Sequence, residues 1–347
     1  MRLFGKSHRN ASLTLVGVFL ALVVAGIVYE KIGERRDRTR YARIGDPVNI
    51  GNRTLNLYCS GQGSPVVVFE SGAHTAGYGW VSVQPEVAKF TRACWYDRAG
   101  FGWSDPGPAP RTYAAIAEDL HSLLQAAGVP GPYVMVGATA GAYHVRVYNG
   151  RHPEEVAGAV LVEASDTDLT EHVPPRLTGR LERQPGWVQQ ATCRIVKPAL
   201  LHVGLLRLLN NPHDGWPFGM RFLPPEEQNE LAFLSITPLG EMSEGAGCSM
   251  AQSMADVRAS GTFGNRPLRV LASSHRFVSS EPDLAEDMEK LNRFWFGELQ
   301  PRLAALSSRG RLEVSEDAEG PAAILAAIKA VVAEVRELPP SNPAASR

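Results

Sequence analysis

Residues 132–148 constrain the fold of this chain most, and they read Pro-Tyr-Val-Met-Val-Gly-Ala-Thr-Ala-Gly-Ala-Tyr-His-Val-Arg-Val-Tyr. The stretch opens with an apolar run that has the length of a buried strand. A turn of very small residues follows, with one hydroxyl, Thr139, at its tip, and then a segment of helical character. Gly137 and Gly141 stand on either side of Thr139, where a Cβ would clash if strand and helix packed closely. The stretch therefore predicts a strand, a sharp turn and a helix.

The rest of the chain alternates strand-like and helix-like patterns around this stretch. Apolar runs of strand length lie at 65–70, 92–97, 156–163, 267–273 and 311–315, and helix-like segments lie at 80–90, 113–127, 287–306 and 321–336. This alternation predicts an α/β fold with a mostly parallel central sheet flanked by helices. Ligands of such sheets bind beyond the carboxyl ends of the strands. We therefore expect the loops at 72–77 and 98–105, the turn at Thr139 and the strand end at Glu163 to surround one site.

The alternation stops between residues 164 and 265. This stretch is rich in proline, leucine, tryptophan and arginine, and it is too long for a simple loop of a compact domain. We interpret it as a helical cap inserted over the site. The cap then divides the α/β core into a first part at 47–163 and a second part at 266–337, and a disordered tail follows at 338–347.

The N-terminal region predicts a membrane helix. Residues 10–29 contain no charge and match the ~20 residues that a helix needs to cross a bilayer. A basic segment at 1–9 precedes them, and an arginine-rich linker at 30–46 follows. The alternative is a cleaved signal peptide, whose apolar region is usually ~7–15 residues and ends at a small-residue cleavage site, which Ala-Gly-Ile at 25–27 matches poorly. We expect a membrane protein with a single-pass N-terminal anchor and an extracytoplasmic body, with a cytoplasmic body as the alternative.

Charge and motif content argue against several classes of function. The net charge is −1 and the pI is near 6.8, so no global field attracts nucleic acid, and we expect no nucleic-acid partner. The chain has no Cys-x-x-Cys, Cys/His knuckle or His-Glu-x-x-His, so we expect no metal. Residues 137–141 lack the Gly-x-Gly-x-x-Gly turn of a dinucleotide site, and we expect no cofactor. The expected partners are a small-molecule ligand or substrate and the membrane.

The four cysteines leave two alternatives open. Cys59 and Cys94 lie at or beside expected strands, and Cys193 and Cys248 fall in the irregular middle of the chain. Outside the cytoplasm two disulfides can form, Cys59–Cys94 and Cys193–Cys248. The alternative is four buried thiols, because free cysteine is often fully buried.

Four stretches together resemble the α/β-hydrolases, in particular their capped, esterase/lipase-like members. They are Val-Val-Val-Phe-Glu-Ser-Gly at 66–72, Tyr-Asp-Arg-Ala-Gly-Phe-Gly-Trp-Ser-Asp at 96–105, Gly-Ala-Thr-Ala-Gly at 137–141 and Val-Leu-Val-Glu-Ala-Ser at 160–165. Their order and spacing extend the resemblance over residues 47–336. It implies the α/β-hydrolase fold, with residues 137–141 as the nucleophile elbow.

The resemblance also implies a catalytic triad and an oxyanion hole. In the family an elbow serine attacks an ester, an amide or a related group, a histidine takes its proton, and an acid orients the histidine. Thr139 stands at the place of the serine. The oxyanion donors would be the N–H of Ala140 and one N–H from Ala73 or His74. The acid would be Glu163, which could instead bond the backbone of the elbow.

The histidine of the family is missing from its usual place. It belongs to the loop after the last strand, but that loop, 316–321, contains none, and no histidine follows His275. His275 and His74 are the candidates for a relocated base; their alternatives are a solvent-facing loop position for His275 and a structural role for His74. We expect His144 to pack beneath the turn.

Two hypotheses for function follow. The first is a pseudoenzyme, a membrane-anchored α/β-hydrolase-fold protein with a degenerate triad that binds a small apolar or ester-like molecule with weak or no hydrolysis. The strained backbone of an elbow tip supports it, because a β-branched threonine tolerates unusual dihedral angles poorly. The alternative is an active ester or amide hydrolase in which Thr139 works with His275 or His74.

Overall fold

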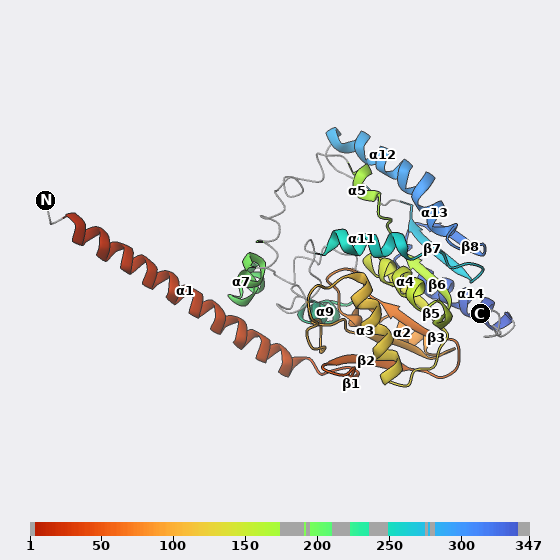
Figure 1. The fold of residues 1–347 in the computed structure, drawn as a ribbon, viewed down its shortest axis with the longest axis horizontal. Coiled ribbons are helices and arrows are strands. Elements are labelled where there is room, and N and C mark those ends of the chain that lie inside the picture. The colour runs from red at the N-terminus through yellow and green to blue at the C-terminus, as the bar shows by residue number, and fades with distance from the viewer. Residues whose placement is uncertain are drawn as a thin grey trace.

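The computed structural model describes residues 4–173, 191, 195–209, 223–235, 249–274, 277 and 282–338 (Figure 1). A long N-terminal helix, α1 (Phe4–Arg40), projects from a body of strands and helices. The elements between the end of α1 and the last helix alternate largely as the sequence pattern predicts.

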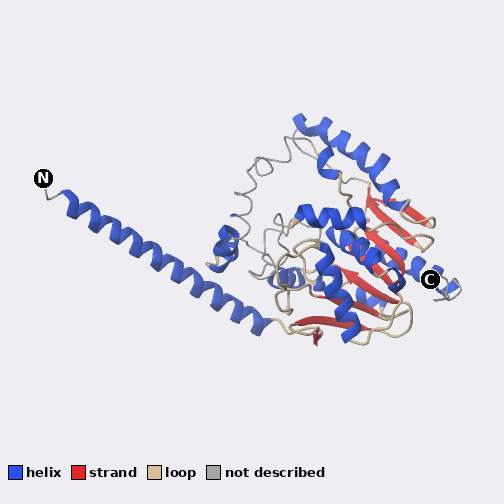
Figure 2. Ribbon diagram, in the orientation of Figure 1, coloured by secondary structure: helices blue, strands red, loops and turns tan. Residues whose placement is uncertain are grey.

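One sheet forms the centre of the body (Figure 2), and in the described residues its eight strands lie in the order β1-β2-β4-β3-β5-β6-β7-β8. The strands are β1 (Asp46–Asn49), β2 (Thr54–Ser60), β3 (Val66–Glu70), β4 (Ala93–Tyr96), β5 (Tyr133–Ala138), β6 (Val156–Val162), β7 (Leu268–Ser273) and β8 (Gly310–Ser315). β2 pairs antiparallel with β1 and β4, and the pairings among β3 to β8 are parallel. The predicted mostly parallel sheet is confirmed.

Helices cover both faces of the sheet, and each face has its own apolar core. On one face pack α3 (Tyr113–Ala126), α4 (Ala140–Arg151), α11 (Met250–Ala259) and α13 (Gln300–Ala304), and on the other pack the 3-10 helix Gly77–Trp80, α2 (Gln84–Val87) and α14 (Pro321–Glu337). Along β3, Val66 and Val68 join the first core, whereas Val67 and Phe69 join the second. Side chains of a strand alternate between faces, so an unbroken apolar run is what a doubly covered strand requires.

Local signals set where these helices begin. α3 starts after Thr112, whose hydroxyl accepts a hydrogen bond from the N–H of Ala115 over 3.2 Å, as expected of an N-cap. α14 begins with Pro321, whose missing N–H costs nothing in the first turn. α12 (Ala285–Phe294) continues through a π-helical turn (Trp295–Leu299) into α13.

The segment between β6 and β7 contains the short helices α5 (Leu169–His172), α7 (Lys197–His202), α8 (Leu205–Leu209) and α9 (Pro225–Ser235), followed by α11. α11 packs on the sheet core beside α3 and α4, with Val257 fully buried there. The last part of the expected cap, 164–265, therefore lies in the helix layer of the core. The boundaries of the cap stay a prediction, because residues 174–190, 210–222 and 236–248 lie outside the described residues.

Among the described residues one helix is long and apolar enough to cross a membrane, namely α1 over Leu13–Arg40. The helix does not end with the charge-free stretch but continues through Arg40, into the expected linker. The next residues are fixed to the body, since Tyr41 stacks on Phe233 of α9 with ring centroids 5.5 Å apart. Arg38 and Arg43 lie over the ring of Trp103, 5.1 and 5.3 Å from its centroid.

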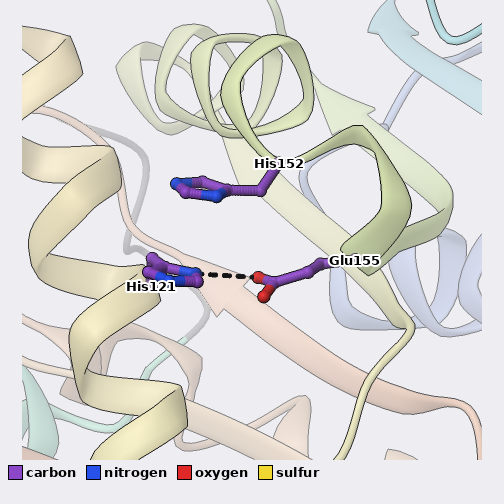
Figure 3. Close-up of side chains that lie close together, drawn as sticks. All are labelled: His121, His152 and Glu155. Carbon is purple, nitrogen blue, oxygen red and sulfur yellow. Dashed lines mark hydrogen bonds and ion pairs between the residues drawn. The ribbon is translucent and has the colours of Figure 1, made fainter. Parts of the chain in front are cut away.

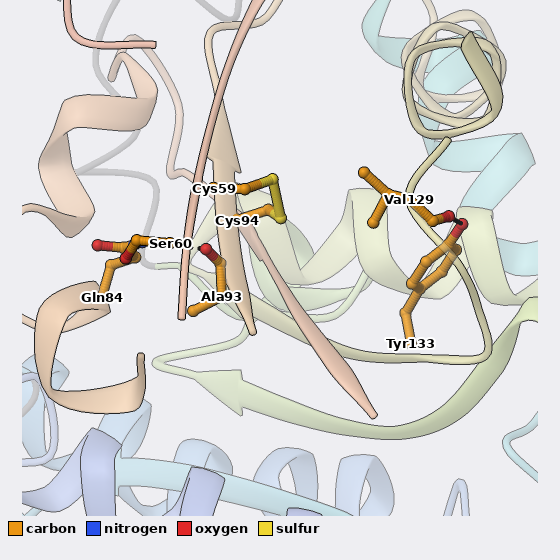
Figure 4. The surroundings of a disulfide bond; sticks show 7 residues. All are labelled: Cys59, Ser60, Gln84, Ala93, Cys94, Val129 and Tyr133. Carbon is orange, nitrogen blue, oxygen red and sulfur yellow. Dashed lines mark hydrogen bonds between the residues drawn. A yellow bond between two sulfur atoms is a disulfide. The ribbon is translucent and has the colours of Figure 1, made fainter. Parts of the chain in front are cut away.

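Cys59 and Cys94 form a disulfide between β2 and β4 (Figure 4). The two residues face each other in the strand register, and their Cα atoms are 4.1 Å apart. Beside them, Gln84 donates to the hydroxyl of Ser60 over 2.7 Å and to the carbonyl of Ala93 over 3.0 Å. The Cys59–Cys94 pairing is confirmed, whereas Cys193 and Cys248 lie outside the described residues.

Candidate functional site

The turn at Thr139 joins β5 directly to α4, as the sequence predicts. Thr139 itself has φ 49° and ψ −112°, a left-handed conformation that is rare for a β-branched residue. A Cβ built on Gly137 would lie 2.5 Å from the carbonyl oxygen of Gly141, and one built on Gly141 would collide with the carbonyl oxygen of Glu70. Backbone occupies the space at both positions, so both require glycine. We call residues 137–141 the Thr139 turn.

The hydroxyl of Thr139 is directed at the loop that follows β3. A Cβ built on Gly72 of that loop would lie 2.5 Å from Oγ1 of Thr139. The side chain of Thr139 makes no capping hydrogen bond to α4. The backbone fixes the turn instead, because the N–H of Thr139 donates to the carbonyl of Val162 over 2.8 Å. The turn is thereby tied to the end of β6.

The loop after β3, residues 71–76, carries the expected oxyanion residues Ala73 and His74. His74 has φ 54°, a second left-handed residue beside Thr139. Arg98 fixes the loop by donating to three of its carbonyl groups, those of Ser71 (2.8 Å), Gly72 (2.7 Å) and Thr75 (3.3 Å). The other expected donor, the N–H of Ala140, lies in the first turn of α4, where N–H groups have no acceptor within the helix.

A buried charged network lies beneath this loop. Glu70, at the end of β3, accepts hydrogen bonds from Tyr96 (2.6 Å), Arg98 (2.9 Å) and Nδ1 of His144 (3.0 Å). Burial acts to raise the pKa of Glu70, but the interactions with His144, Arg98 and Tyr96 outweigh it, and the pKa lies below its usual value. The carboxylate is therefore ionised at neutral pH. His144 is buried there, beneath the turn as expected.

Asp97, directly after β4, holds the neighbouring loops together. Its carboxylate accepts from the N–H groups of Gly77 (2.9 Å) and Trp103 (3.1 Å) and from the side chain of Asn56 (3.0 Å). Burial raises the pKa of Asp97 to about 6, despite these hydrogen bonds. A Cβ on Gly102 would collide with the same carboxylate. Asp97 thus fixes the loop 98–105 and the start of the 3-10 helix.

Glu163 is fully buried at the end of β6, with φ 49°. Its Oε1 accepts a hydrogen bond from the N–H of Ser273 at the end of β7, and its own N–H donates to the carbonyl of Leu271 over 2.9 Å. The side chain therefore bridges the ends of two neighbouring strands, close to the Thr139 turn. The expected base, His275, is two residues after Ser273 in the sequence and lies outside the described residues.

The loop after β8 offers carboxylates but no histidine. The carboxylate of Asp317 lies against the backbone of Gly320, since a Cβ built there would collide with it, at the start of α14. An anion is stabilised at this end of a helix. Asp317 therefore lies at the N-terminus of α14.

The described residues contain one group that could hold a metal, His121, His152 and Glu155 (Figure 3). The imidazole rings stack with centroids 4.0 Å apart, and Nδ1 of His121 lies 3.1 Å from Oε2 of Glu155. Glu155 also accepts from Tyr148 and Gln125. His152 follows the last residue of α4, whereas Thr139 precedes its first, so about 18 Å of helix separates the group from the turn. The group links α3 to the connection before β6 and lies outside the site.

A family model described as the alpha/beta hydrolase fold matches residues 65–300, more than half of the chain. The chain belongs to the α/β-hydrolase family. The resemblance stated from its motifs is confirmed, and so is the fold. At the tip of the Thr139 turn, however, this α/β-hydrolase departs from the Gly-x-Ser-x-Gly pattern.

Solved structures agree with this fold. The Cif epoxide hydrolase from Acinetobacter nosocomialis is similar with a TM-score of 0.59 and 14% identity, over 84% of this chain and 90% of that one. A thermophilic esterase from Thermogutta terrifontis is similar with a TM-score of 0.52 and 21% identity, over 85% and 99%. These likenesses concern the fold alone.

A curated relative is an uncharacterized vacuolar membrane protein from Saccharomyces cerevisiae, 35% identical over 109 residues. The match spans 30% of this chain and 17% of the yeast protein. The similarity therefore covers a small part of that protein.

The network around Glu70 is the part of the site that sequence reasoning missed. Its signal is present, because Glu70 ends a fully apolar run and Arg98 follows a buried strand almost directly. Charges in such positions are expected to be paired. The pattern does not tell which charges pair, and His144 joins them from α4, 74 residues after Glu70.

Proposed function

We propose that this α/β-hydrolase is a membrane-anchored protein with a degenerate catalytic triad, which binds a small apolar or ester-like molecule with weak or no hydrolysis. The observation that carries the proposal is the hydroxyl of Thr139. Thr139 stands at the place of the family serine, and the loop after β8, where the family histidine belongs, contains none. An alcohol needs a base within hydrogen-bond reach to act as a nucleophile. The site therefore has the geometry of the family turn without a histidine at the family's usual position.

Ligand binding does not depend on the missing groups. The N–H of Ala140 and one N–H from Ala73 or His74 would hold a carbonyl oxygen of the ligand. Backbone donors need no particular side chain, and Arg98 keeps the loop with Ala73 and His74 in place through its carbonyl groups. An ester-like group would thus bind beside Thr139 without being cleaved.

One observation favours an active ester or amide hydrolase instead. Glu163 is bonded to the N–H of Ser273, two residues before His275. An acid at this place could orient a histidine on the loop that follows β7, and His275 would then serve Thr139 as base. His74, in the loop that faces Thr139, is the other candidate for that role.

The test is hydrolysis of short-chain p-nitrophenyl esters by the full chain in detergent micelles. We expect wild type and Thr139→Ala to have the same low rate, because the family's usual base is missing from the loop after β8. A rate that Thr139→Ala abolishes, and that His275→Ala or His74→Ala lowers as well, would establish the active alternative.

Thr139→Ser is the matched control. It keeps the hydroxyl and removes the methyl group. It therefore distinguishes two causes of a low rate of hydrolysis, a poor nucleophile and a missing base. We expect it to remain as slow as wild type. A rise of ~100-fold or more, the size of a general-base contribution, would mean that a base is in place and that the degenerate triad is wrong.

We also propose that α1 is retained as a single-pass anchor and that the body lies outside the cytoplasm. The disulfide Cys59–Cys94 supports this side, because such bonds persist in oxidising compartments. The intact mass of protein purified from native membranes tests the anchor, and loss of residues 1–29 would contradict it. Labelling of intact cells with a membrane-impermeant amine reagent tests on which side of the membrane the body lies. A body without label would contradict an extracytoplasmic location.

A further inference from the structure

Two short helices of the segment between β6 and β7 lie against α1 (Figure 1). They are α7 and α8, joined at Val203 and Gly204, and we call residues 195–209 the α7–α8 hairpin. The contact is far from the sheet in Figure 1. It joins parts of the chain that are 170 residues apart in sequence at the pair Arg207 and Asp37.

The helices meet at a glycine on each side. A Cβ built on Gly26 of α1 would collide with the carbonyl oxygen of Val203, and one built on Gly204 would lie 3.0 Å from the ring of Tyr29. Gly204 has φ +70°. Glycine at such contacts lets two backbones approach closely, as it does between membrane helices.

Arg207 of α8 adds an ionic contact to this packing. Its guanidinium binds Glu30 over 3.0 Å and Asp37 over 2.6 Å. The side chain crosses α1 at Gly33, where a Cβ would lie 2.5 Å from Nε of Arg207. Glu30 is only 5% exposed. Contacts at Gly26, Gly33 and Asp37 therefore fix the position of the hairpin along α1.

This position places the hairpin at the level of the bilayer. Glu30 is the first charge after the charge-free stretch 10–29, and Gly26 lies within that stretch. Four residues of helix rise about 6 Å. If α1 crosses a bilayer, the contact at Gly26 lies at the boundary between head groups and hydrocarbon, with Tyr29 in the layer that aromatic residues favour.

The hairpin also exposes large apolar side chains. Ile195 is 67% exposed, Val196 47%, Leu200 41% and Leu208 68%. The apolar residues of α1 between Leu13 and Val28 are largely exposed as well. Exposed apolar side chains on two packed helices are unfavourable in water and favourable in the interface of a bilayer.

We propose that the α7–α8 hairpin is a second membrane contact, which inserts its apolar side chains into the lipid interface beside α1. The inference rests on the proposed anchoring by α1. Its occupant is lipid, because α7 packs on the segment of α1 that would itself lie in lipid.

The experiment uses the full chain in phosphatidylcholine nanodiscs that contain a lipid with a diazirine in its acyl chain. After illumination, mass spectrometry locates the labelled peptides. We expect label in residues 13–29 and in residues 195–209. The edge strand β8 provides a control, because it lies far from α1 in Figure 1 and its residue Val314 is 50% exposed, and we expect no label there.

Leu200→Asp in α7 is the matched perturbation, with Val314→Asp as its control. A carboxylate opposes insertion, and we expect label in the hairpin to fall about tenfold with Leu200→Asp and to stay unchanged with Val314→Asp. Label in α1 without label in the hairpin would overturn the inference and leave the anchor intact. Absence of label from both would overturn the anchor, and the inference with it.

Discussion

Removal of the Cys59–Cys94 disulfide should cost more stability than most single substitutions in this chain. The bond joins residues with a sequence separation of 35. Closing a loop of this length removes ~13 cal/mol/K of entropy from the unfolded chain, or about 4 kcal/mol at 25 °C. The variant Cys59→Ala/Cys94→Ala removes this constraint and leaves Cys193 and Cys248 untouched. We expect its free energy of unfolding to fall by about 4 kcal/mol and its Tm by roughly 10 °C.

Urea unfolding of the full chain in detergent micelles, followed by tryptophan fluorescence, measures this loss. Trp95 is buried next to Cys94 and reports on the strand that carries the bond. Each single variant breaks the same bond, so the loss in the double variant should be far smaller than the sum of the two single losses. Additive losses, or a loss below about 1 kcal/mol, would show that the bond does not restrict the unfolded chain as argued.

Two further predictions concern the residues that hold the site. Gly141→Ala places a Cβ against the carbonyl of Glu70, and it should lower the free energy of unfolding by at least ~2 kcal/mol in the same assay. As the control, Gly297→Ala places its Cβ in open space within a helical segment and should be neutral or stabilise by up to ~1 kcal/mol. Equal effects of the two substitutions would contradict the close packing of the turn. Burial raises the pKa of Asp97 from its usual 3.8 to about 6, so its contribution to stability is full below pH about 4 and is lost as pH rises through 6. Asp97→Asn should flatten this part of the stability profile between pH 4 and 7, and an unchanged slope would contradict the assignment.

The sheet and the Thr139 turn could be predicted from sequence because their signals are local. An apolar run such as 65–70 suits only a strand covered on both faces, and Gly137 and Gly141 suit only a turn in which backbones touch. The order of such elements places Thr139, the loop after β3 and Glu163 at one end of the sheet. The location of the site therefore needs no knowledge of side-chain contacts.

The partners of individual side chains could not be predicted in the same way. Glu163 bonds to Ser273, 110 residues away, and Glu30 bonds to Arg207, 177 residues away. Such pairs depend on rotamers and on how distant segments pack, which no local pattern encodes. The continuation of α1 through Arg40 could not be predicted either, because it involves a distant residue. Arg207 pairs with Glu30 and Asp37 in a stretch whose charges suggest a linker.

The fixed end of α1 determines how far the body can reach. The helix of 37 residues is about 55 Å long, and Tyr41 is stacked on Phe233 directly after it. If α1 is the membrane anchor proposed above, a flexible linker would let the body move freely above the membrane, whereas a continuous helix with a stacked joint restricts its height and tilt. The site would then meet mainly molecules that lie near that height. A Gly/Ser segment in place of residues 30–40 would replace this rigid connection by a flexible linker and widen the range of heights that the site can reach.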